Sequence, residues 1–152
     1  MYKNILIALD GSPTSNLALQ EALKIAEPGS KITAITVVEN PLQSYMIMYD
    51  YAKVHDELVE HCQHILNQAI KVVKKYEHIQ LETHVIDINP NSSYDIALAI
   101  ENAANQYHAD LIVIGTHGRH GFHRFFFGSI AEQLVRQSHL PVLLVRNQSA
   151  EL

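Results

Sequence analysis

The sequence predicts a single α/β domain built on an open five-stranded parallel sheet with helices on both faces, in a Rossmann-like arrangement. Two observations favour this fold. Short, nearly continuous apolar runs recur along the chain, as in strands that are buried on both faces. Segments with apolar residues at helical spacing lie between these runs. Because strands that alternate with helices form right-handed crossovers, they give a parallel sheet covered on both sides.

Length and composition fit one domain with a sizeable core. The chain has 152 residues, of which 47% are hydrophobic and 18% charged. We expect one domain over residues 1–148 and a frayed tail over 149–152. The net charge of −5 gives no general attraction to nucleic acid or to an anionic membrane. The single cysteine, the lack of a signal-peptide pattern and the lack of a long apolar span predict a cytoplasmic protein.

The first third of the chain predicts a strand, a helix and a strand. Asn4–Leu9 is a short apolar run that ends at a turn. In that turn Ser12 suits a helix N-cap and Pro13 suits the first helical turn. Pro28 and Gly29 end the helix. Ile32–Val38 is rich in β-branched residues and predicts the second strand.

The middle of the chain predicts a long helix, a less covered strand and another helix. Residues 40–50 are irregular and suggest a loop or a helix start. Ala52–Lys75 has the apolar spacing of an amphipathic helix. In Ile79–Ile86 apolar and polar residues alternate, which predicts a strand less buried than the others. After a turn at 89–93, helical spacing returns over Ile96–Tyr107.

The last third predicts strand, helix and strand again. Leu111–Ile114 is the fourth strand, Ile130–Gln137 is the last full helix, and Pro141–Val145 is the fifth strand. Because the fifth strand is short and close to the C-terminus, we expect it at an edge of the sheet, where an apolar strand recruits another strand.

The predicted fold places two polar or glycine positions at one crevice. Asp10 follows the first strand and Gly115 follows the fourth. Ligands of open parallel sheets bind beyond the carboxyl ends of the strands, where strand order reverses. If the first and fourth strands are neighbours there, Asp10 and Gly115 face the same ligand.

A glycine element after the fourth strand carries the main functional signal. Its pattern is Gly115-x2-Gly118-x9-Gly128-Ser129, and the last two residues open a helix. Glycines let backbone N–H groups approach a phosphate, and a helix N-terminus adds unpaired donors and partial positive charge. The element is neither a P-loop nor the dinucleotide-binding fingerprint. It predicts an anion site, with a nucleotide phosphate as the usual occupant.

The loop inside this element is locally positive. No acidic residue occurs between Asp110 and Glu132, whereas that interval holds two arginines and three histidines: Arg119, Arg124, His117, His120 and His123. Anion binding accounts for this bias, and an ordinary solvated loop is the alternative. The histidine spacing would also allow a metal site, although contacts with phosphate or solvent are the favoured interpretation.

Three other features each have a functional and a structural interpretation. Glu57, His61 and His64 share one helix face and could hold a metal, but a solvated helix face is the favoured interpretation. Phe125–Phe127 is either packing against the domain or a lid or partner surface. Cys62 lies on the apolar stripe of its helix, which favours a buried structural thiol over a nucleophile.

Three parts of the chain together resemble the universal stress protein A family, in its ATP-binding branch. They are the opening segment Ile5–Ser12, the glycine element and the closing strand Pro141–Val145. The resemblance spans nearly the whole chain. It implies an adenine nucleotide alpha hydrolase-like fold and a homodimer joined through the last strand. It also implies ATP, with a divalent cation (Mg²⁺ or Mn²⁺) held mainly by the phosphates.

The resemblance also implies roles for individual residues. Asp10 would lie beside the ribose, although Asp-Gly is also turn chemistry. Val37 would meet adenine largely through its backbone. The glycine element would line the ribose and phosphates and hold the phosphate tail, through Gly115, Gly118, Gly128, Ser129 and the Ile130 amide.

Three functions remain open at this point. The first is an ATP-binding regulatory protein of the stress response. The second is a weak ATPase or nucleotide-transfer enzyme on the same fold, although no residue is an evident general base. The third is a nucleotide-free interaction module that uses Tyr45–Tyr51 and Phe125–Phe127 as contact surfaces.

Overall fold

A computed structural model describes residues 1–38, 51–88, 96–116 and 128–147 of the chain. In these ranges five strands form one parallel sheet: β1 (Asn4–Ala8), β2 (Lys31–Val38), β3 (Gln80–Asp87), β4 (Leu111–Gly115) and β5 (Val142–Val145). The helices between them are α1 (Pro13–Ile25), α2 (Tyr51–Val73), α3 (Ile96–Gln106) and α4 (Ser129–Gln137). The predicted fold class is confirmed.

The strand order is β3-β2-β1-β4-β5. β2 and β3 therefore lie on one side of β1, and β4 and β5 lie on the other side, so the strand order reverses at β1. Ile5 pairs with Ile32 of β2 and with Leu111 of β4, so β1 lies at the centre of the sheet. β5 lies at one edge, as the sequence predicted, and β3 lies at the other.

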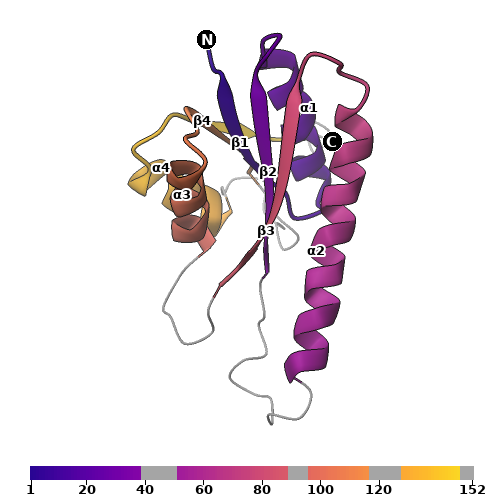
Figure 1. Ribbon diagram of the computed structural model, residues 1–152. Coiled ribbons are helices and arrows are strands. Elements are labelled where there is room, and N and C mark those ends of the chain that lie inside the picture. The colour runs from indigo at the N-terminus through magenta and orange to yellow at the C-terminus, as the bar shows by residue number, and fades with distance from the viewer. Residues whose placement is uncertain (39–50, 89–95, 117–127, 148–152) are drawn as a thin grey trace.

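Helices cover both faces of the sheet (Figure 1), and a separate apolar layer lies under each face. Alternate residues of each strand face opposite sides. Ile5 and Ile7 of β1 pack with α1 and α2, whereas Leu6 packs with α3 and α4. β3 has no fully buried residue, which agrees with the lower coverage predicted for it.

Local sequence accounts for where most elements begin and end. The Ser12 side chain accepts a hydrogen bond from the Ser15 amide and caps α1, and Pro13 opens the helix. Gly29 has a φ of +87°, a backbone conformation that favours glycine, in the turn before β2. β5 begins at Val142 rather than Pro141, and the Pro141 carbonyl accepts a hydrogen bond from Ile112 of β4. Proline has no N–H to add to the ladder.

Candidate functional site

The carboxyl ends of β1 and β4 lie side by side at the point where strand order reverses. Ile7 of β1 pairs with Val113 of β4, so Asp10, which follows β1, and Gly115, which ends β4, lie at the same edge of the sheet. The adjacency expected from fold rules is therefore confirmed. The two elements that leave this crevice are α1, after β1, and the segment that leads to α4, after β4.

Asp10 forms a tight turn at the end of β1. Its Oδ1 accepts a hydrogen bond from the Ser12 amide over 2.8 Å, and Gly11 between them has a φ of +80°. This is the turn chemistry that the Asp-Gly pair allows. The side chain is half-buried. The turn fixes the direction of the carboxylate, because the bond to Ser12 restrains it.

Hydroxyl side chains fill the first turn of α1. Ser12, Thr14 and Ser15 are all buried. Ser12 Oγ lies 3.3 Å from Thr14 Oγ1, and Ser15 Oγ donates to the Ser12 carbonyl over 2.9 Å. These bonds satisfy polar groups at the end of a helix that is enclosed by the domain.

Gly115 is packed against this turn of α1. A β-carbon at Gly115 would lie 2.8 Å from Thr14 Oγ1, 2.9 Å from the Thr14 carbonyl carbon and 3.0 Å from the Ser15 nitrogen. Two of these atoms belong to the backbone, so a side chain could not be accommodated by a rotamer change. The sequence suggested a ligand role for Gly115 and gave no sign of this packing requirement.

The amino end of α4 is tied to the end of β4. The Gly128 amide donates to the Thr116 carbonyl over 2.6 Å, and the Thr116 amide donates to Val145 of β5. Gly128 is the N-cap of α4 and makes no side-chain capping bond in the described structure. Since its own amide is engaged, the donors that α4 offers to an anion are those of the residues that follow, Ser129 and Ile130.

Val37 lies where β2 extends past the end of β1. The Leu9 amide donates to the Ile35 carbonyl, so the backbone of Ile35 points toward β1. In a parallel strand the same direction recurs two residues later, at Val37. The Val37 backbone therefore points to the β1 side of β2, beyond the last residue of β1 that pairs with β2. The buried Cys62 thiol of α2 donates to the Val37 carbonyl over 3.9 Å, a contact that the sequence did not suggest.

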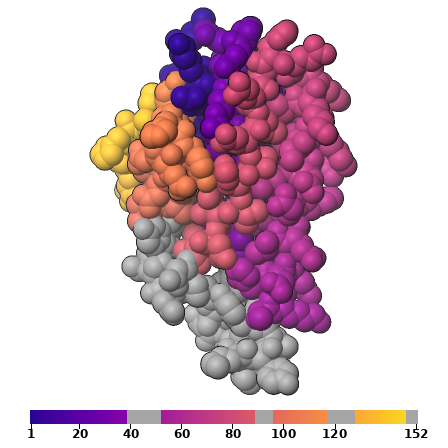
Figure 2. All heavy atoms as spheres, viewed as in Figure 1, coloured from indigo at the N-terminus to yellow at the C-terminus, as the bar shows by residue number. Residues whose placement is uncertain are grey.

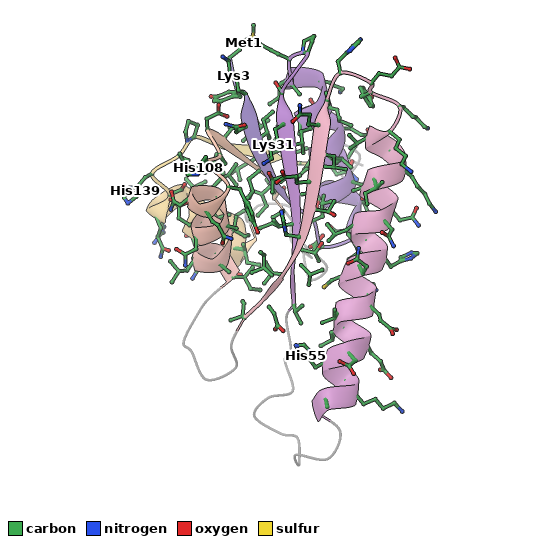
Figure 3. The ribbon with its side chains drawn as sticks, viewed as in Figure 1. Met1, Lys3, Lys31, His55, His108 and His139 are labelled. Atoms are coloured by element: carbon green, nitrogen blue, oxygen red, sulfur yellow. The ribbon has the colours of Figure 1, made fainter. Side chains whose placement is uncertain are left out.

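A further contact lies near the same end of the sheet. His55 of α2 lies near the carboxyl ends of the strands (Figure 3). Its Nε2 lies 2.7 Å from Asp87 Oδ2, at the last residue of β3. This hydrogen bond joins the amino-terminal half of α2, whose described side chains from 52 to 61 are not fully buried, to the sheet.

Several predicted features lie outside the described residues. Gly118 and the positive loop belong to 117–127, which also contains Phe125–Phe127, and Tyr45–Asp50 belongs to 39–50. Within the described ranges, no group of three or more His, Cys, Asp or Glu side chains could hold a metal ion, and this covers Glu57, His61 and His64. None of the described helices combines the length and the hydropathy that a membrane-spanning segment needs.

Comparison with known proteins identifies the family. Residues 1–146 match the universal stress protein family. The chain belongs to the universal stress protein family. A putative universal stress protein from Staphylococcus aureus is 30% identical over 150 residues, which cover 97% of this chain and 86% of that protein.

Solved structures of universal stress proteins share the fold. The protein UspA from Lactobacillus plantarum superposes with a TM-score of 0.80 at 27% identity, covering 95% of this chain and 98% of that one. The universal stress protein from Archaeoglobus fulgidus in complex with dAMP superposes with a TM-score of 0.65 at 21% identity, covering 95% and 98%. Nucleotide binding is thus known for a relative with this architecture.

Proposed function

We propose that this universal stress protein binds ATP at the crevice between β1 and β4 and acts as a nucleotide-dependent regulatory protein in the cytoplasm. One observation carries the proposal. The Gly128–Thr116 hydrogen bond holds the amino end of α4, without a side-chain cap, beside the end of β4, the strand that pairs with β1 before Asp10. Uncapped amides at a helix N-terminus favour an anion such as phosphate.

The proposed nucleotide spans the crevice from β2 to α4. Adenine meets the backbone of Val37, which extends past β1. The ribose lies beside Asp10, whose carboxylate is oriented by its turn. Gly115 and Gly118 line the ribose and phosphates. The phosphate tail lies at the amino end of α4, where Gly128 leaves room for it and Ser129 and the Ile130 amide bind it.

The proposed divalent cation is held mainly by the phosphates. The described residues contain no cluster of acidic, His or Cys side chains of the kind that binds a metal. Mg²⁺ binds mainly through phosphate oxygens and water when protein ligands are few. Bound in this way, the ion would neutralise part of the phosphate charge. The backbone amides of α4 would orient the phosphates.

The proposed assembly is a homodimer joined through β5. β5 is an edge strand, and Val142, Leu143 and Leu144 are only half-buried within one chain. A two-fold partner that offered the same strand would cover this edge and bury these side chains further.

Nucleotide retention tests the proposed function directly. Native mass spectrometry of the purified protein should show a mass increment of one nucleotide with its ion. Added ATP should raise the melting temperature of nucleotide-free protein, because a ligand of the native state stabilises it. Steady phosphate release above background would instead favour the weak ATPase. If no nucleotide is retained and ATP causes no change in melting temperature, only the nucleotide-free interaction module remains as a function.

A further inference from the structure

The outer face of α2 carries a charge pattern that no contact within the described chain uses. Six exposed charged residues lie on it or on the turn that follows it: Asp56, Glu57, Glu60 and Lys71 on the helix, and Lys74 and Lys75 after its end at Val73. Lys53, near the start of the helix, is a further exposed charge that lies outside this set. The described structure gives none of them an ion pair. α2 forms one long side of the molecule, and its outer face turns away from the sheet (Figures 1 and 2).

The acidic and basic groups mirror each other along the helix. The three acidic residues lie in the amino-terminal half of α2, whereas Lys71 lies in its last turn and the other two lysines directly follow the helix. Their spacings are symmetric about a point between Ile65 and Leu66. Four exposed polar positions near the centre follow the same symmetry: Gln63 matches Gln68, and His64 matches Asn67. The exposed His61 does not, since its match is the half-buried Ile70.

Compensation of the helix dipole does not account for this pattern. Charges interact with the dipole mainly in the first and last turns. α2 has no acidic residue in its first turn, and its last turn contains only Lys71 among the lysines. Glu60 is nine residues beyond Tyr51, where the helix begins. The mirror spacing and the neutral centre therefore need another explanation.

We propose that the outer face of α2 is a docking surface for the same face of a second copy of this chain, with the two helices antiparallel. A two-fold axis between Ile65 and Leu66 would bring Glu60 of each copy opposite Lys71 of the other. Glu57 would meet Lys74, and Asp56 would meet Lys75. Each match occurs twice, because a two-fold contact is self-complementary. The neutral amides would meet around the axis.

The chemistry of this surface predicts a weak contact that depends on salt. Exposed ion pairs contribute little individually, and the face has no apolar seam. Charges near the surface are screened over about 10 Å at 0.1 M salt. The contact therefore forms at low ionic strength and dissolves at high ionic strength. It is separate from the β5 edge, since β5 and the strands under α2 lie in different parts of the sheet.

Two double variants with equal net charge test the proposal. Glu60→Lys with Lys71→Glu exchanges the members of one matched pair, so every match stays attractive. Glu60→Lys with Lys75→Glu makes the same number and kind of changes but places like charges opposite each other in two of the three matches. Sedimentation velocity at about 100 µM protein would compare both with the parent, in roughly 20 mM and 500 mM salt.

The parent and the pair-exchange variant should each sediment faster in low salt than in high salt, with at least a tenfold loss of association in the mismatched variant. The quantity compared is the difference in sedimentation coefficient between low and high salt. It can be interpreted whether the high-salt species is a monomer or the proposed β5 dimer. Circular dichroism would verify that both variants are folded. A parent with no salt-dependent association, or two variants that associate equally, would overturn the proposal.

Discussion

The first turn of α1 leaves no room for a side chain on Gly115, because a β-carbon there would lie 2.8 Å from Thr14 Oγ1. The glycine that ends β4 is therefore required by the fold as well as being a candidate ligand residue. Any substitution at this position mixes a packing effect with a binding effect, and the two need separate measurements.

Gly115→Ala should destabilise the protein even without a ligand. Overpacking of this kind costs about 1–3 kcal/mol, which corresponds to several degrees in Tm for a chain of this size. Adding Thr14→Ala should not restore the loss, since the Thr14 carbonyl carbon and Ser15 nitrogen would remain 2.9 and 3.0 Å from the new β-carbon. Thermal unfolding of the single and double variants checks this. An unchanged Tm in Gly115→Ala would contradict the packing.

Gly118→Val should remove the stabilisation by ATP while leaving the unliganded Tm close to that of the parent. A branched side chain would block the approach of phosphates to the loop backbone. At a hundredfold excess over Kd, a ligand stabilises the native state by about 2.7 kcal/mol. Differential scanning fluorimetry with ATP should detect this increment in the parent alone. A full ATP shift in the variant would move the phosphate site elsewhere.

Variants of Asp10 should separate its two interpretations. Asp10→Asn retains an oxygen that can accept the Ser12 amide, whereas Asp10→Ala removes the 2.8 Å turn bond. If the carboxylate binds ribose, the parent should prefer ATP over 2′-deoxy-ATP, and Asp10→Ala should lose much of that preference. Calorimetric titration with both nucleotides measures the ratio of Kd values. If the ratio of Kd values is unchanged in Asp10→Ala, Asp10 is a turn residue only. Because Asp10→Asn keeps an acceptor for the Ser12 amide, its Tm should stay close to that of the parent if this hydrogen bond is what the turn needs.

Leu143→Lys should give monomeric or insoluble protein if β5 joins two copies. Leu143 lies in the middle of the edge strand and packs partly into the layer under α1 and α2. A charge buried there would have no partner. Ala150→Lys adds the same charge to the expected frayed tail and should change neither the association state nor the solubility of the protein. Sedimentation in high salt distinguishes these cases, and a parent that is monomeric at micromolar concentration would contradict the β5 dimer.

The Glu82 carboxyl should titrate below its ordinary pKa of 4.5. The hydrogen bond from Lys31, whose Nζ lies 2.7 Å from Glu82 Oε2, lowers this pKa, and desolvation opposes the shift. His84 at 3.7 Å adds to the lowering. Lys31 lies on the same strand pair, in β2 (Figure 3).

Because the folded pKa is depressed, the pair adds stability above pH 4.5 and loses it as pH falls through the folded value. Lys31→Met should raise the Glu82 midpoint, measured by carbon-detected NMR titration. Lys24→Met is a matched control, since Lys24 pairs with Glu21 instead. A Glu82 midpoint that stays the same in Lys31→Met would contradict the assigned cause.

The sequence was sufficient for the fold because its signals are local. Apolar runs and helical spacing marked each element, and Ser12 and Pro13 marked the start of α1. Fold rules then placed Asp10 beside the end of β4. What the sequence could not show are contacts between distant segments. The contact of Cys62 with Val37 and the fit of Gly115 against Thr14 depend on how helices seat on the sheet, and no local pattern encodes that.

The central position of β1 has a consequence for how the chain folds during synthesis. Asn4 and Asp110, whose amide and carboxylate are bonded, are 106 residues apart in sequence. β1 leaves the ribosome first and can pair with β2 early, but its other edge stays open until β4 has been made. Closing so long a stretch of chain is slow, and open apolar strand edges aggregate. Nascent chains stalled before Leu111 should therefore depend on chaperones, whereas the completed domain has β1 covered on both edges.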